Sequence, residues 1–192
     1  MRNIFLLLLI SSTLFQQGCV PLAVTGIVAT GLAVGDRRST GIYIEDENVE
    51  WKAQARIREK YKDVHVNATS FNLTVLLTGE VSSEEIKKDT TQLVRSIPNV
   101  RSVINELVVG GNSSVTSRGN DTLITSNVKT HFIGNNHFAA HHIKVVTEAG
   151  VVYLMGIVSR AEGDAAADVA RNTSGVSRVV KVFEYISDAA TK

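Results

Sequence analysis

Two stretches of the chain share one pattern of apolar and polar positions. The first, "VHVNATSFNLTVLLTGEV", covers residues 64–81, and the second, "HHIKVVTEAGVVYLMGIV", covers residues 141–158. When Gly79 is placed over Gly156, apolar residues coincide at the pairs Val66/Ile143, Val75/Val152 and Leu77/Leu154. Each stretch predicts a short strand, a turn and a second strand that ends at glycine.

An amphipathic helix is predicted after each strand pair. Both helices begin with Ser-x-x-Glu, at residues 82–85 and 159–162, which is typical of a capping box that satisfies free amides at the helix start. The first helix ends at Pro98 and the second before Gly175. Their apolar faces carry Ile86, Thr90, Leu93, Val94 and Ile97 in the first and Ala166, Val169, Ala170 and Thr173 in the second. Gly79 and Gly156 are interpreted as backbone requirements at a strand-to-helix turn.

A further helix precedes the strands in each half, and a last strand follows at residues 100–109 and 176–185. The acidic run at 45–47 is expected to begin the first of these helices, and Asp121 to cap the second. Their buried faces carry Val49, Ala53 and Ile57 in the first and Ile124, Val128, His131 and Phe132 in the second. The chain is therefore a duplication of a helix-strand-strand-helix-strand unit, an α+β fold with helices packed on a small three-stranded sheet.

The N-terminal residues have the pattern of a secretory signal. Met1 and Arg2 precede the apolar run "IFLLLLISSTLF", which is too short for a membrane-spanning helix, since that needs about 20 apolar residues. Gly18 directly precedes Cys19, the only cysteine of the chain. A small residue before a cysteine is the arrangement on which bacterial lipoprotein processing depends. Residues 1–18 are therefore predicted to be a lipoprotein signal peptide, and Cys19 the lipidated residue.

Lipidation also explains why the chain keeps one thiol, because an unpaired cysteine is unfavourable in an oxidising compartment. The alternative is a spare thiol behind an ordinary signal peptide, since Gln16 occupies the position where lipoprotein signals usually carry leucine. Three acyl chains on Cys19 would hold the protein at a membrane essentially permanently. Val20 follows the cysteine, in place of the aspartate that commonly retains enterobacterial lipoproteins at the inner membrane. Resemblance to those lipoproteins implies the outer membrane as the destination, with the protein facing the periplasm.

Composition limits the class of function. The chain has 20 Lys and Arg against 19 Asp and Glu, which argues against a nucleic-acid partner because such proteins carry a basic excess. The sequence contains no nucleophile elbow, Gly-rich phosphate loop or second thiol, so no enzyme is expected. Residues 19–41 are interpreted as the acylated N-terminus and a tether whose end, "DRRSTG" (36–41), returns the chain to water. Residues 110–119, "GGNSSVTSRG", have the composition of a flexible linker.

The two units, each with "VxLxG" on its second strand, resemble BON domains. Behind an acylated cysteine and "DRRSTG", the whole chain resembles the dual-BON-domain outer-membrane lipoproteins of Gram-negative bacteria. The resemblance gives a first BON domain at 42–109, a second at 120–187 and a tail at 188–192. It implies a non-enzymatic protein that binds anionic phospholipid, of the phosphatidylglycerol or cardiolipin class, through the first helix of the second domain. It also implies a role in outer-membrane integrity, with a link to sites of cell division.

The helix expected to start near Asp121 has a face suited to such a contact. At about 100° per residue, Leu123 and Ile133 fall opposite the buried side, with Lys129 beside Ile133. Two aliphatics and a lysine suit a headgroup region, while Val128 supports the helix from beneath. The candidate phospholipid-binding residues are therefore Leu123, Val128, Lys129 and Ile133. The alternatives are an ordinary exposed surface and a membrane-tethered adaptor that binds an envelope protein.

Four histidines, at positions 131, 137, 141 and 142, crowd into "HFIGNNHFAAHH". Zinc ligands need fixed spacings on ordered elements, and most of these residues fall in an expected loop, so a metal-dependent hydrolase is the weakest alternative. Imidazoles that gain positive charge near anionic lipid as the pH falls are favoured over a metal site, and solvated loop histidines without such a role are the default interpretation. No metal and no cofactor are expected, apart from the lipid on Cys19. Trp51 is expected either between the two domains or half exposed.

Overall fold

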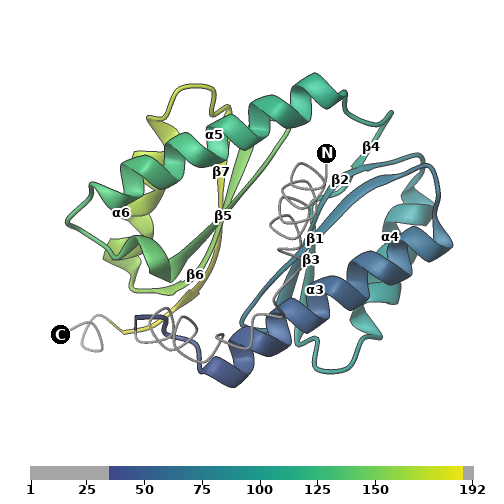
Figure 1. Cartoon of the computed structure of the whole chain (residues 1–192), viewed down its shortest axis with the longest axis horizontal. Coiled ribbons are helices and arrows are strands. Elements are labelled where there is room, and N and C mark those ends of the chain that lie inside the picture. The colour runs from purple at the N-terminus through teal and green to yellow at the C-terminus, as the bar shows by residue number, and fades with distance from the viewer. Residues whose placement is uncertain (1–34, 188–192) are drawn as a thin grey trace, which may run out of the picture. The chain divides into compact units, whose positions relative to one another are not determined.

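The computed structural model of the chain describes residues 35–187 (Figure 1). The lipidation predicted at Cys19, the signal peptide, most of the tether and the tail at 188–192 lie outside these residues. The described residues belong to one compact unit.

The element order confirms the duplication and the α+β class. The first half contains α3 (Thr40–Lys60), β1 (His65–Phe71), β2 (Thr74–Val81), α4 (Glu84–Arg95), β3 (Ser102–Asn105) and β4 (Val108–Val109). The second half contains α5 (Val115–Ile133), the short 3-10 helix η2 (Ala140–His142), β5 (Ile143–Glu148), β6 (Val151–Val158), α6 (Arg160–Arg171) and β7 (Arg178–Tyr185).

Each half builds one small mixed sheet around a central strand. β1 pairs antiparallel with β2, which pairs in parallel with β3 and with β4. In the second half β5 pairs antiparallel with β6, which pairs in parallel with β7. The last strand expected in the first half is thus split in two, at a turn where Asn105 Oδ1 accepts a hydrogen bond from the Leu107 amide at 2.9 Å. β7 is continuous, so only the second sheet has the three strands expected of both.

Gly79 and Gly156 lie inside β2 and β6, at equivalent positions of the two ladders, and not at a strand-to-helix turn. A Cβ at Gly79 would come within 2.0 Å of the His65 carbonyl oxygen. One at Gly156 would come within 2.6 Å of the His142 carbonyl oxygen. The expected backbone requirement is confirmed, but its cause is the close approach of the neighbouring strand.

Helix α5 begins earlier than its sequence indicates. Its N-cap is Ser114, whose hydroxyl accepts a hydrogen bond from the Ser117 amide at 3.1 Å. The prediction that Asp121 caps this helix is therefore wrong, because a serine in extended conformation already satisfies the first turn. Since α5 starts at Val115, only the first part of the 110–119 linker is non-helical.

Helix α3 likewise begins ahead of the acidic run at residues 45–47. Its N-cap is Ser39, whose hydroxyl accepts a hydrogen bond from the Ile42 amide at 3.3 Å. The prediction that the acidic run begins the helix is therefore wrong. Asp46 instead lies buried in the helix interior.

The segment at 36–41 does not simply return the chain to water. The side chain of Arg38 is 7% exposed and forms a salt bridge with Asp46 at 2.9 Å. Arg37 reaches the second half, where its Nη1 donates to Glu162 Oε2 at 2.7 Å. The start of the described chain is thus bound to both domains.

The capping box expected for α6 is confirmed, whereas the one expected for α4 does not form, because the residue three positions after its N-cap is Ile86 and has no side-chain acceptor. Ser159 Oγ accepts from the Glu162 amide at 3.2 Å, while Glu162 Oε2 accepts from the Ser159 amide at 2.8 Å. In the first half the N-cap is Ser83, whose hydroxyl accepts from the Ile86 amide at 3.2 Å. Ser82 is therefore not the cap of α4.

Each half encloses its own apolar core between its two helices and one face of its sheet. The first core is built from Val49, Ala53, Ile57, Val66, Val75, Leu77, Val81, Val94, Ile97 and Leu107. The second is built from Ile124, Val128, Phe132, Phe138, Ile143, Val145, Val152, Leu154, Val158, Ala166, Ala167 and Ala170. Both cores contain the apolar helix faces and strand positions that the repeat predicts.

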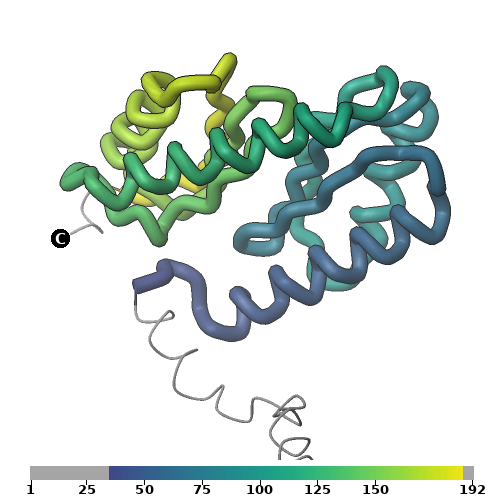
Figure 2. Tube along the Cα trace, turned by 45° about the horizontal axis from the view of Figure 1, so that its top comes forward, coloured from purple at the N-terminus to yellow at the C-terminus, as the bar shows by residue number. Residues whose placement is uncertain are grey.

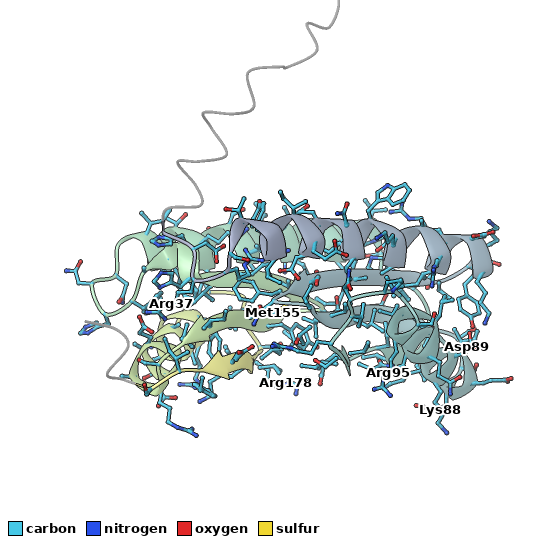
Figure 3. All side chains as sticks on the ribbon, turned by 90° about the horizontal axis from the view of Figure 1, so that it is seen from below. Arg37, Lys88, Asp89, Arg95, Met155 and Arg178 are labelled. Atoms are coloured by element: carbon cyan, nitrogen blue, oxygen red, sulfur yellow. The ribbon has the colours of Figure 1, made fainter. Side chains whose placement is uncertain are left out.

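A third apolar cluster joins the two halves through their sheets. It is built around Phe71, Leu76, Tyr153 and Met155, and Met155 lies between the strands of the two halves in Figure 3. Figures 1 and 2 show the strands between α3 and α4 on one side and α5 and α6 on the other. A salt bridge between Lys144 and Glu50 also joins the halves. The helices therefore keep outer faces that no other described element covers completely.

Candidate functional site

Helix α5 is held in place by a row of apolar side chains. Ile124, Val128 and Phe132 are at most 2% exposed and belong to the core of the second half. The Phe132 ring packs edge-on against Phe138, with centroids 4.9 Å apart. The helix therefore presents a fixed outer face. None of the helices in residues 35–187 has the length and apolarity that a membrane crossing requires.

The outer face of α5 carries three strongly exposed aliphatic side chains. Leu123 is 64% exposed, Ile133 79% and Val115 80%. Val115 and Ile133 are the first and last residues of this 19-residue helix. At 3.6 residues per turn they project along one line, about 27 Å apart, with Leu123 about 80° around the helix from that line. Sequence analysis missed Val115 because it placed the helix start near Asp121.

The hydroxyl groups on this face are already hydrogen bonded to the helix itself. The donors and their backbone carbonyl acceptors are Thr122 to Arg118 at 3.0 Å, Ser126 to Thr122 at 3.0 Å and Thr130 to Ser126 at 2.9 Å. A hydroxyl bonded to its own backbone needs no further donor bond, which lowers the free-energy cost of removing it from water. The outer face of α5 is therefore less polar than its sequence indicates.

The outer face of α5 carries no exposed carboxylate. Asp121, the only acidic residue of the helix, is 5% exposed and accepts hydrogen bonds from the Ala149 and Gly150 amides. Lys129 and Arg118 are both exposed. An anionic surface that approached α5 would meet cations and no acid.

The structure places the four candidate phospholipid-binding residues on two sides of α5. Leu123, Lys129 and Ile133 are exposed, while Val128 is fully buried. Val128 therefore has the supporting position and cannot itself contact a lipid. Cys19, the predicted lipidation site, lies outside the described residues.

The histidines of "HFIGNNHFAAHH" do not converge. His131, expected on the buried face of α5, is exposed because it lies at the edge of that face. His137 and His141 are also exposed. Burial lowers the pKa of His142, and the nearby charge of Arg37 lowers that pKa further. These four side chains form no group of converging metal ligands in the described part of the chain.

Three other side chains do converge, where the two halves meet. His65 of β1, Glu80 of β2 and Glu148 of β5 place ligand-type atoms within 4.8 Å of one another. Sequence analysis missed this cluster because Glu148 comes from a different domain. Half of the cluster could have been found from the predicted hairpin, because the pairing of its two strands places His65 opposite Glu80.

The two carboxylates of this cluster have pKa shifts of opposite sign. Burial raises the pKa of Glu80, but hydrogen bonds from the Ser113 amide and from His65 outweigh burial and leave that pKa below its usual value. Burial also raises the pKa of Glu148, and there it dominates. The hydrogen bond from Asn67 lowers the pKa of Glu148 only in part, and the charge of Glu80 raises it again.

A second exposed apolar surface lies on α3. Trp51 is 74% exposed, Ile44 56% and Tyr43 47%. Ile44 and Trp51 are about two turns apart and share one stripe, and Glu47, between them, is exposed. Trp51 therefore lies neither between the domains nor half exposed, as the sequence analysis expected, but in solvent.

Comparison with known proteins gives one family for both halves. The BON domain family matches residues 46–111 and 120–187. Over 184 residues the chain is 35% identical to "Outer membrane lipoprotein DolP" of Haemophilus influenzae, which covers 94% of this chain and 95% of that protein. It is 32% identical to the "21 kDa hemolysin" of Actinobacillus pleuropneumoniae, over 79% of each chain. It is 28% identical to "Osmotically-inducible protein Y" of Escherichia coli, over 72% of each chain.

Proposed function

The chain belongs to the BON domain family, and on that premise we propose that it is an outer-membrane lipoprotein that binds anionic phospholipid through α5. It would face the periplasm, use lipids of the phosphatidylglycerol or cardiolipin class, and help to maintain outer-membrane integrity without catalysing a reaction. Similarity over nearly the whole chain to an outer-membrane lipoprotein supports the location. The cysteine at position 19 supports the mode of anchoring. A role at division sites extends this proposal and is tested by fluorescence microscopy of the tagged protein in dividing cells.

The outer face of α5 is the observation that carries the lipid proposal. Its aliphatic side chains Val115, Leu123 and Ile133 are exposed, its hydroxyls are bonded to the helix, and Lys129 and Arg118 flank it. A helix with exposed aliphatics, satisfied polar groups and basic flanks suits the boundary between headgroups and acyl chains.

The energetics fit a contact that works only at a membrane. Burying a whole aliphatic side chain contributes about 1.5–3 kcal/mol, and Leu123, Ile133 and Val115 are already partly covered. A total of about 4 kcal/mol corresponds to a Kd of about 1 mM, so the face alone binds weakly. An acyl anchor would hold α5 near lipid at an effective concentration in about the millimolar range, which makes such a contact populated.

Vesicle co-sedimentation of a soluble form that begins after Cys19 tests the proposal. We expect more protein to sediment with phosphatidylglycerol vesicles than with phosphatidylcholine vesicles, and less at high salt, since Lys129 and Arg118 contribute attraction. The double variant Leu123→Asp/Ile133→Asp should lower the affinity at least about tenfold, a loss of about 1.4 kcal/mol. Val108→Asp is the matched control, because it replaces an aliphatic residue that is 60% exposed but lies on β4, away from α5. This variant should bind as tightly as the parent protein does. Equal, negligible sedimentation with both lipids would remove the proposal.

A protein-binding adaptor is the second candidate, and the α3 surface favours it. The indole of Trp51 and the side chain of Ile44 are exposed beside Glu47, an acidic neighbour that would repel an anionic bilayer. Tryptophan is enriched among the residues that dominate protein–protein binding energy. A photo-crosslinking residue at position 44 should then capture one envelope protein, while the same residue at position 108 should not. Identical capture patterns at both positions would argue against the adaptor.

A further inference from the structure

The cluster of His65, Glu80 and Glu148 has the dimensions of a metal site. His65 Nδ1 lies 2.9 Å from Glu80 Oε2 and 3.7 Å from Glu148 Oε1. Around a zinc ion with bonds of about 2.0–2.2 Å, tetrahedral ligand atoms stand about 3.3–3.6 Å apart. Both distances from His65 Nδ1 are therefore within about half an ångström of the spacing that a common ion requires, and all three ligand atoms lie within 4.8 Å of one another.

The surroundings of the cluster compensate the Glu148 carboxylate only in part, and they bring a second carboxylate, Glu80, close to it. Glu148 is 7% exposed and Glu80 9%. Among the described residues, His65 alone lies within salt-bridge distance of either carboxylate. Arg118 and Lys129 line the adjoining groove but form no salt bridge with either one. Two nearly buried carboxylates that face each other are unfavourable unless a proton or a cation lies between them.

Both carboxylates are oriented by neighbours that are not themselves ligands. Glu148 Oε2 accepts a hydrogen bond from Asn67 Nδ2 at 2.9 Å, while its Oε1 points toward His65 Nδ1 and accepts no hydrogen bond from residues 35–187. Glu80 Oε2 accepts from the Ser113 amide at 3.0 Å. Outer partners of this kind commonly fix metal ligands in position.

We propose that His65, Glu80 and Glu148 bind one Zn²⁺ ion that joins the two BON domains. Imidazole nitrogen and carboxylate oxygen are both zinc ligand types, and three protein ligands would leave the fourth position to water. Mg²⁺ and Ca²⁺ prefer a larger number of oxygen ligands, so the imidazole nitrogen favours zinc.

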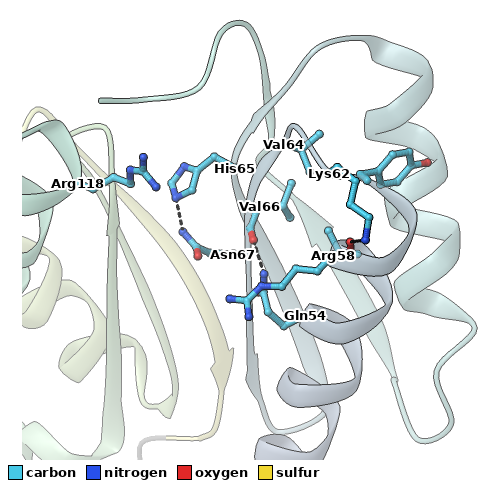
Figure 4. A pocket seen from close by; sticks show the side chains of 10 residues that line it. Gln54, Arg58, Lys62, Val64, His65, Val66, Asn67 and Arg118 are labelled. Carbon is cyan, nitrogen blue, oxygen red and sulfur yellow. Dashed lines mark hydrogen bonds between the residues drawn. The ribbon is translucent and has the colours of Figure 1, made fainter. Parts of the chain in front are cut away.

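The cluster can be reached from solvent. A groove of about 500 Å³ beside α3 and one of about 460 Å³ beside α5 meet at His65, and both also include Asn67 and Arg118. Figure 4 shows His65 between Arg118 and Asn67, with Nε2 directed to the Asn67 amide at 3.4 Å. Nδ1 faces the carboxylates and also the Ser113 hydroxyl, whose oxygen lies 3.1 Å away. An ion would bind at Nδ1, and because zinc ligands must be deprotonated, its affinity should fall at acid pH.

The ion would stabilise the contact between the domains, because two of its ligands come from the first domain and one from the second. A ligand that binds only the folded arrangement raises the stability of that arrangement. The outer face of α5 uses none of these three residues, so the zinc proposal does not depend on lipid binding.

The test uses the full-length protein in detergent, freed of metal with a chelator and then titrated with ZnCl₂. We expect one equivalent of zinc per chain by calorimetry and by elemental analysis after gel filtration, together with a higher Tm. MgCl₂ at the same concentration should leave the Tm unchanged. Glu148→Gln should weaken zinc binding at least about tenfold and abolish the rise in Tm.

Two controls keep the test decisive. The double variant His137→Ala/His141→Ala removes exposed histidines and should keep the full zinc response. Glu148→Gln removes a repelling charge while its amide oxygen can still accept from Asn67, so without metal it should unfold no earlier than the parent. Should that variant nevertheless fail to fold, His65→Gln provides the same readout. Absence of stoichiometric zinc, equally tight zinc binding by the ligand variants, or loss of binding in the surface double variant would overturn the proposal.

Discussion

Asp46 and Asp121 hold equivalent hairpins in the two halves of the molecule. Each lies inside the first helix of its domain and accepts two backbone hydrogen bonds, of 2.8–3.0 Å, from the two-residue turn of the following hairpin. All of these turn residues have positive φ, between 49° and 73°. Two-residue hairpin turns require this backbone conformation, although residues other than glycine rarely adopt it. The turn residues are Asn72 and Leu73 in the first half and Ala149 and Gly150 in the second.

The first prediction concerns this aspartate. Asp121→Ala should lower the free energy of unfolding by about 2–4 kcal/mol, because two amides of the hairpin turn lose a charged, buried acceptor. Asp168→Ala is the matched control, since Asp168 is in an exposed ion pair with Arg171, and should change that free energy by less than about 0.5 kcal/mol. Urea unfolding measures both. Similar losses in the two variants would contradict the anchoring role of Asp121.

The second prediction concerns the strand glycines. Gly79→Ala should destabilise the first domain by about 3 kcal/mol, because the new Cβ meets the His65 carbonyl and the residue has a φ of +109°. Gly156→Ala should cost less, since the approach is less close there. Gly110→Ala, which meets nothing within 4 Å, is the control. Thermal unfolding measures all three variants. If Gly110→Ala lowers the stability as much as Gly79→Ala does, this explanation of the "VxLxG" pattern is wrong.

The third prediction is a pH dependence with opposite signs at two neighbouring glutamates, measured without metal. The pKa of Glu148 is raised on folding, so the stability linked to its protonated form is present below the ordinary glutamate pKa of about 4.3 and is lost as pH rises through the folded pKa. Glu148→Gln should therefore be more stable than the parent at neutral pH and equal to it in acid.

Glu80 should behave in the reverse way. Its folded pKa is lowered, so its stability contribution is present above the ordinary pKa and is lost as pH falls through the folded value. Glu80→Gln should be less stable than the parent at neutral pH, and the difference should close in acid. Thermal unfolding across the acid range checks both variants, and the same sign of effect for both would contradict the assigned environments.

Local sequence signals predicted most of the fold, because the same pattern of apolar and polar positions occurs in both halves of the chain. Alternation at Val75 and Leu77, and again at Val152 and Leu154, identifies buried strands without knowledge of the partner strand. The errors lie at helix starts, where several neighbouring polar residues could each serve as the N-cap. Ser114 caps α5 while Asp121 binds a hairpin turn that only the folded chain brings near.

The two candidate sites differ in how far the sequence predicts them: the α5 surface follows from local spacing, whereas the His65 cluster depends on contacts between the domains. Helical periodicity found Leu123 and Ile133, because the outer face of a helix follows from spacing alone. It missed Val115 through the wrong helix start. No spacing rule could place Glu148 beside His65, because their contact depends on how two domains pack. The ion pair of Arg37 with Glu162 was missed for the same reason, since Glu162 lies in the second domain, far from Arg37 in the sequence.

The most direct test of the lipid contact is the depth of single fluorophores in a bilayer. The soluble form that begins after Cys19 has no cysteine, so one cysteine can be introduced at position 123, 133 or 108 and labelled. With phosphatidylglycerol vesicles that carry a quencher on their acyl chains, labels at 123 and 133 should be quenched and the label at 108 should not. Quenching that is absent at 123 and 133, or equal at all three positions, would contradict the account of α5 as the lipid-binding surface.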